Sequence, residues 1–84
     1  MKFSIKVRVK SLRRATRKAM DAEITAILGG TADDAKVDGA QVWRRFGNVE
    51  IIDRTNSKAI SGDAEPETVT ALRRVMSNYG CEAA

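Results

Sequence analysis

The fold is decided by residues 1–18, MKFSIKVRVKSLRRATRK, which also carry most of the positive charge. Residues 2–10 of this stretch alternate strictly between apolar and polar side chains. The apolar positions are Phe3, Ile5, Val7 and Val9. Side chains of a strand point alternately to opposite faces, so this period of two predicts a half-buried β-strand. Most outward positions are basic, which suits either an edge strand protected by charge or a cationic stripe for a partner.

A helix is predicted over residues 12–28, with Ser11 as its N-cap and Gly29-Gly30 at its end. Small residues line one side of this helix, and we expect that side to lie close on a sheet. These residues are Ala15, Ala19, Ala22 and Ala26.

Four basic residues occupy the first two turns of the same helix: Arg13, Arg14, Arg17 and Lys18. Like charges four positions apart repel by about 0.2–0.5 kcal/mol per pair. The helix dipole is also positive at this end, where Asp or Glu would be favoured. Residues that break a local rule together indicate a functional site, and we expect a phosphate or carboxylate to bind here. The alternative is neutralisation within the chain, by Asp21 or by the acidic residues 33–38 folding back over the basic face.

The middle of the chain reads as a polar linker, residues 31–40, followed by a meander of strands. Strands are predicted over residues 42–46 and 49–54, joined by the two-residue turn Gly47-Asn48. This register pairs Arg45 with Glu50 and Trp43 with Ile52, both favourable cross-strand pairs. A second turn at residues 56–57 leads to a short strand over residues 58–61.

Arginines and aromatic residues alternate in the segment Val42-Trp43-Arg44-Arg45-Phe46. On a sheet surface such residues can stack bases while the cations contact phosphates. The simpler interpretation is that Trp43 belongs to the core. Arg45 already has a predicted partner in Glu50, so Arg44 is the better candidate for an external contact.

The last helix obeys the local rules that the first one breaks. Pro66 suits its first turn, acidic residues lie at its positive end, and Gly80 ends it. The apolar stripe Val69, Leu72, Met76 and Tyr79 predicts a core-facing side, with a dimer seam as the alternative.

We therefore predict a single α+β domain over residues 1–80 with the order β-α-β-β-β-α and a mobile tail at residues 81–84. A mostly antiparallel sheet with both helices on one face would bury the two helical stripes together. The alternative order β-α-β-β-α-β needs a final strand, for which few residues remain after Gly80.

Composition narrows the classes of function. The 84 residues contain no His and one cysteine, Cys81, so an internal disulfide and imidazole chemistry are both absent. No carboxylate is paired with a nucleophile, a metal motif or a phosphate-binding glycine loop. We expect a cytoplasmic, non-enzymatic protein without metal or cofactor, not associated with a membrane, and either a monomer or a homodimer.

Charge asymmetry is the clearest functional signal. Residues 1–18 hold eight basic and no acidic residues, while the remaining 66 hold seven basic and eleven acidic ones. This dipolar pattern favours a small module that docks its basic face onto a larger protein assembly, such as a phage- or plasmid-type inhibitor or adaptor of a nucleic-acid-handling complex. The alternative is direct binding of nucleic-acid phosphates. The candidate contact residues are Lys6, Arg8, Lys10, Arg13, Arg14, Arg17, Lys18 and Arg44.

Overall fold

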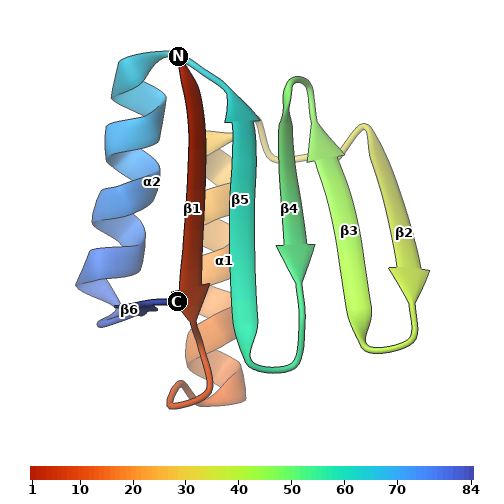
Figure 1. Ribbon diagram of the computed structural model, residues 1–84, viewed down its shortest axis with the longest axis vertical. Coiled ribbons are helices and arrows are strands. Elements are labelled where there is room, and N and C mark those ends of the chain that lie inside the picture. The colour runs from red at the N-terminus through yellow and green to blue at the C-terminus, as the bar shows by residue number, and fades with distance from the viewer.

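The computed structural model describes residues 1–84 and contains six strands and two helices (Figure 1). In chain order the elements are β1 (Lys2–Arg8), α1 (Arg14–Ile27), β2 (Asp34–Asp38), β3 (Gln41–Phe46), β4 (Val49–Asp53), β5 (Ser57–Asp63), α2 (Pro66–Asn78) and β6 (Glu82–Ala83). The strands form one sheet in the order β2-β3-β4-β5-β1-β6, in which every neighbouring pair is antiparallel. The predicted α+β class and the two-helix, one-sheet architecture are confirmed.

Both helices cover the same face of the sheet, so the opposite face is open. In Figure 1, α1 lies behind β1 and β5 and α2 lies beside β1. Between the layers lies one core of 14 buried hydrophobic residues. The inward positions of β1 join it as the alternation predicted, and Met20 and Ile24 of α1 are fully buried. Three members of the predicted α2 stripe, Val69, Leu72 and Met76, are buried as well. Neither helix has the length and apolarity needed to cross a membrane.

The predicted hairpin is present in the predicted register. Phe46 pairs with Val49, Arg45 lies opposite Glu50, and Trp43 lies opposite Ile52. Gly47 has a φ of 59°, a left-handed conformation that tight hairpin turns favour and glycine adopts easily. The hairpin therefore forms as local turn chemistry and cross-strand pairing predict.

Two segments predicted to lack regular structure are strands. Residues 34–38 of the expected linker form the edge strand β2, paired with β3 through a turn at Gly39, which has a φ of 60°. Glu82 and Ala83 of the expected mobile tail pair with Arg8 and Val7 as β6. Both segments are exposed and lack an apolar pattern, so their pairing depends on the edges of a sheet formed by other residues.

Two predictions about α1 are wrong. The N-cap is Arg13, without a side-chain cap hydrogen bond, whereas Ser11 lies in a turn in which Leu12 N–H bonds Val9 O at 3.0 Å. The four alanines of the small-residue stripe are exposed. Burying the larger Met20 and Ile24 removes more apolar surface from water, and this turns the alanine side outward.

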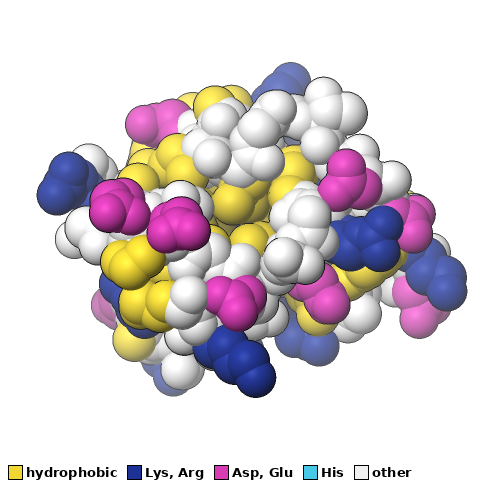
Figure 2. All heavy atoms as spheres, turned by 90° about the horizontal axis from the view of Figure 1, so that it is seen from above, with side chains coloured by type: hydrophobic (Ala, Val, Ile, Leu, Met, Phe, Trp, Pro, Cys, Tyr) yellow, Lys and Arg dark blue, Asp and Glu magenta, His cyan; other side chains and the backbone are white.

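The charge asymmetry of the sequence becomes a spatial one. At one end of the sheet β1 finishes, α1 starts and β4 turns into β5; we call this the basic end. It carries Arg8, Lys10, Arg13, Arg14, Arg17 and Arg54, which outnumber the acidic residues there, Asp38, Asp53 and Glu82. At the opposite, acidic end β2 and α2 start and β5 finishes, with Asp33, Asp34, Asp63, Glu65 and Glu67. Figure 2, a view from above in the frame of Figure 1, shows acidic side chains around an apolar centre at the acidic end, with some Lys and Arg side chains among them.

Candidate anion-binding cleft

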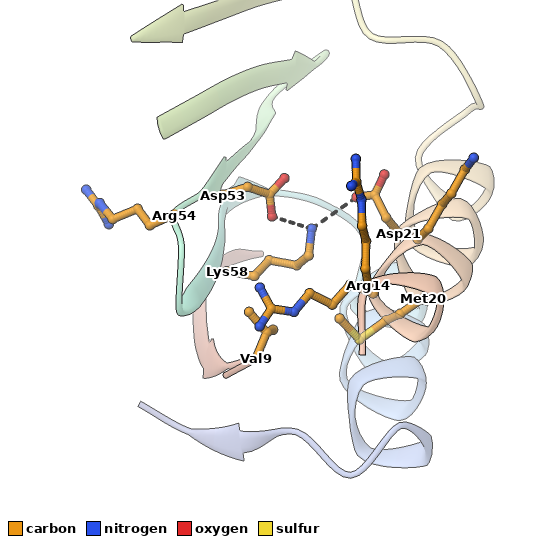
Figure 3. Close-up of a pocket in the computed structure, with 9 residues that line it drawn as sticks. Val9, Arg14, Met20, Asp21, Asp53, Arg54 and Lys58 are labelled. Carbon is orange, nitrogen blue, oxygen red and sulfur yellow. Dashed lines mark hydrogen bonds and ion pairs between the residues drawn. The ribbon is translucent and has the colours of Figure 1, made fainter. Parts of the chain in front are cut away.

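A cleft of about 320 Å³ opens at the basic end, between the first turns of α1 and the β4–β5 connection (Figure 3). Five cationic and two acidic side chains contribute to its lining. The full lining is Val9, Arg14, Arg17, Lys18, Met20, Asp21, Asp53, Arg54 and Lys58. The excess of positive charge makes the cleft suitable for an anion.

The start of α1 supplies three of these cations. The helix begins without an acidic residue in its first turn and without a side-chain cap. Its first N–H groups therefore have no intrahelical carbonyl partner and add a partial positive charge at this end. The side chains of Arg14 and Lys18 are exposed and form no hydrogen bond or ion pair within the chain. They remain available for a ligand.

Arg17 has a structural role in the same region. Its guanidinium donates to the carbonyl oxygens of Leu12 at 3.1 Å, Thr55 at 2.8 Å and Lys10 at 3.4 Å. These bonds tie the β1–α1 connection and the β4–β5 turn to the helix. Arg17 therefore shapes the cleft, and most of its donors are already used.

Three lining residues of the cleft, Asp21 of α1, Asp53 of β4 and Lys58 of β5, form an ion-pair network with Arg44 of β3. We call it the charge quartet. Lys58 Nζ lies 3.0 Å from Asp21 Oδ1 and 2.5 Å from Asp53 Oδ1, between the two carboxylates (Figure 3). Arg44 Nη2 reaches the same two residues, 2.6 Å from Asp21 Oδ1 and 2.9 Å from Asp53 Oδ2. The quartet is electrically neutral, so the net charge of the cleft comes from α1 and Arg54.

Burial differs within the quartet. The Lys58 side chain is only 5% exposed, whereas those of Asp21 and Asp53 are about one-third exposed at 32% and 30%. Burial by itself raises the pKa of Asp21, but hydrogen bonds from Arg44 and the charge of Lys58 outweigh it and hold the pKa below 3.8. Asp21 is therefore ionised at neutral pH.

A second recess continues the cleft along the basic end. It shares Arg14, Arg17 and Arg54 with the cleft and extends to Thr55 and to Ala40 of the β2–β3 turn. The Arg54 side chain points away from the cleft in Figure 3, and its Nε donates to Gln41 Oε1 at 3.1 Å. Cations thus continue from the cleft around the β4–β5 turn.

The contact residues predicted from the sequence lie in different parts of the structure. Arg14, Arg17 and Lys18 line the cleft, and Arg13 and Lys10 flank it at the start of α1 and on the preceding turn. Lys6 and Arg8 lie on the open face of the sheet, because they alternate with the buried Ile5 and Val7. The eight residues therefore do not form a single face.

Arg44, the proposed external contact, is bound inside the quartet, and its side chain is 18% exposed. It also lies over the ring of Phe46, at 5.8 Å from the centroid. The proposed pairing of Asp21 with Arg17 is likewise absent, because Asp21 bonds Arg44 and Lys58. Both corrections have one cause: Arg44 alternates with Phe46 and thus faces the helix layer.

Trp43 lies on the open face, opposite to the core position that we predicted. Since Phe46 and Arg44 face inward, Trp43 and Arg45 must face outward. Trp43 Nε1 donates to Glu50 Oε2 at 3.1 Å, and Glu50 forms no ion pair with Arg45 although the two are opposite in register.

The predicted site residues included neither Arg54, which lies outside the quartet, nor the quartet members Asp21, Asp53 and Lys58. A signal for the quartet is nevertheless present in the sequence. Asp53 continues the alternation of Val49 and Ile51, and Lys58 alternates with Ile60, so both occupy core-facing positions. Opposite charges at inward positions of neighbouring strands indicate an internal ion-pair network.

Comparisons with protein-family models, with curated proteins and with solved structures found no match for this chain.

Proposed function

We propose that the protein is a non-enzymatic nucleic-acid-binding module whose basic end contacts the phosphate backbone. The observation that carries this proposal is the cleft at the start of α1, where Arg14 and Lys18 are exposed and have no partner in the chain. A helix start with free N–H groups and adjacent cations is a suitable site for phosphate. Lys10, Arg13 and Arg54 extend the positive surface on either side.

The surroundings of the cleft favour nucleic acid over a protein partner. Protein interfaces generally have an apolar centre with aromatic or aliphatic anchors. The exposed large hydrophobic residues of this chain are Met1 and Val37, and neither lines the cleft or the adjoining recess. A cationic groove without exposed large apolar side chains fits backbone contacts that depend little on sequence.

Fluorescence anisotropy with labelled duplex and single-stranded DNA and RNA, at low and moderate salt, tests the proposal. Binding that uses three phosphate contacts weakens by roughly 40-fold when salt rises from about 50 to about 200 mM. The double substitution Arg14→Glu/Lys18→Glu removes two contacts and adds repulsion. We expect it to lower affinity at low salt by about tenfold or more.

The matched control is Arg73→Glu/Arg74→Glu on α2. These arginines are also exposed, and the substitution changes the net charge by the same amount. We expect it to lower affinity much less than the cleft variant does. Equal losses for both variants, or no binding by the wild type at low salt, would refute the cleft as a nucleic-acid site. In the second case an acidic protein surface becomes the partner to seek, by pull-down with the intact domain.

A further inference from the structure

The free edge of the sheet at β2 has features that fit a second copy of this chain. β2 ends the sheet on one side, and all five of its residues are exposed. Val37 is 72% exposed although large apolar side chains are otherwise covered almost everywhere. An edge strand presents unpaired N–H and C=O groups to which another strand can add.

The register of the hairpin determines which backbone groups face this edge. In a two-residue hairpin the residues flanking the turn, Phe46 and Val49, form a hydrogen-bonded pair. Backbone groups alternate along β3, so Arg45, Trp43 and Gln41 bond toward β2. Their β2 partners are Asp34, Lys36 and Asp38, respectively. Ala35 and Val37 therefore turn their N–H and C=O groups outward. The Ala35 N–H already bonds the Asp34 side chain, at 2.9 Å to Oδ1, so Val37 supplies the free outward N–H of β2.

We propose that two copies pair antiparallel through β2, about a two-fold axis at Val37, and so continue the sheet across the dimer. In this register each Val37 forms a hydrogen-bonded pair with its copy, and the two exposed side chains meet on the helix side. Lys36 then lies opposite Asp38 of the second copy, twice by symmetry. Such non-hydrogen-bonded positions bring Cα atoms to about 4.5 Å, where opposite charges attract most.

The charges of β2 favour this register over registers whose two-fold axis is shifted along the strand. A shift of the axis to Lys36 would oppose Lys36 with its copy and Asp34 with Asp38, all like-charged pairs. An axis at Ala35 would place Val37 against Asp33, whose N–H is already bonded to Arg45 O at 2.8 Å. The alternating charges of β2 disfavour pairing with other strands, but they are complementary between two copies paired about Val37.

The ends of the molecule support the same arrangement. Antiparallel pairing places the two copies side by side in opposite directions, so the acidic end of each lies beside the basic end of the other. The residues of β2 and of the β2–β3 turn do not line the cleft, so the cleft of each copy stays open in the dimer, whereas Ala40 of the adjoining recess lies opposite Asp34 of the second copy. Failure of the dimer therefore leaves the nucleic-acid proposal unaffected, and the reverse also holds.

Sedimentation velocity of the full chain, from about 10 µM to about 1 mM, tests the dimer, because a contact between two short strands is small and corresponds to weak association. We expect a monomer–dimer equilibrium in this range. Lys36→Asp and Asp38→Lys each create two like-charged pairs and should weaken association by about tenfold. Circular dichroism of each variant checks that the exposed edge substitutions leave the fold intact.

Mixing the two single variants gives the sharpest result. An equimolar mixture of Lys36→Asp and Asp38→Lys restores both opposite-charge pairs, so we expect heterodimers at least as abundant as wild-type dimers. The double variant Lys36→Asp/Asp38→Lys should likewise return to near wild-type association. A wild type that is monomeric at about 1 mM overturns the dimer, because even weak interfaces associate there. Single variants that associate as the wild type does, or a mixture that fails to recover, overturn the register.

Discussion

At the scale of single residues, Lys58 shows how a charge is accommodated in a small core. Its side chain is only 5% exposed, and its ammonium is held by two carboxylates at 3.0 and 2.5 Å. Replacing Lys58 by Met keeps most of the side-chain volume, but Arg44 is then the only cation that pairs with the carboxylates of Asp21 and Asp53. We expect the free energy of unfolding at pH 7 to fall by about 2 kcal/mol, less than for a fully buried pair because the carboxylates are one-third exposed. Urea unfolding measures this loss.

The control for that experiment is Lys36→Met on exposed β2. Lys36 forms no ion pair within the chain, so the change should stay within about 0.5 kcal/mol in dilute solution, where the monomer dominates. Similar losses for the two variants would contradict a stabilising role of the quartet.

Tyr79 provides a second test at this scale. Its hydroxyl donates to Glu23 Oε2 from the neighbouring helix, which favours the neutral phenol and raises the pKa of Tyr79 above 10.0. The raised pKa means that the contact is present below pH 10 and is lost as the pH rises through the folded-state pKa. Tyr79 is the only tyrosine, so absorbance at alkaline pH reports its titration directly. We expect Glu23→Gln to lower that pKa toward 10.0; an unchanged titration would contradict the contact.

At the scale of elements, Gly62 is a position at which β5 lies close to the turn of the β3–β4 hairpin. Its φ is 138°, and a Cβ at this position would lie 2.0 Å from Asn48 O. Gly62→Ala must therefore strain the backbone and displace the hairpin turn, and we expect a loss of stability of about 3 kcal/mol. Thermal and urea unfolding measure it. Gly39→Ala, where a Cβ meets no atom within 4 Å, should lose only about 1 kcal/mol. Equal effects would show that the contact with Asn48 is unimportant.

The elements also show which parts of the fold sequence patterns can predict. Periodicity and turn residues predicted β1, the β3–β4 register and α2, because these depend on neighbours in the chain. The charge of α1 predicted three residues of the cleft. The patterns did not predict β2 and β6, which form only because a sheet edge is available for pairing. They also did not predict which side of α1 faces the sheet, because that depends on how Met20 packs against the sheet. Arg44 was misassigned because its partners, Asp21 and Asp53, come from other elements.

At the scale of the whole molecule, the asymmetry of charge along the chain becomes an asymmetry between two ends. α2 starts at the acidic end, where Glu67 favours its dipole, and α1 starts at the basic end, where its dipole adds to the cations. The unfavourable charges are thus concentrated at one end rather than spread over the surface. An anion bound there would relieve repulsion among side chains, so binding and stability should increase together.

The charge quartet has a consequence for how this chain can change over evolutionary time. Each carboxylate contacts both cations, and the four residues come from four different elements. A substitution at one position leaves the opposite charge without its partner, whereas exchange of all four for apolar residues of similar volume is tolerable. Drift at these sites should therefore be correlated: descendants of this sequence should keep the set or replace it together, with few intermediates that retain three members.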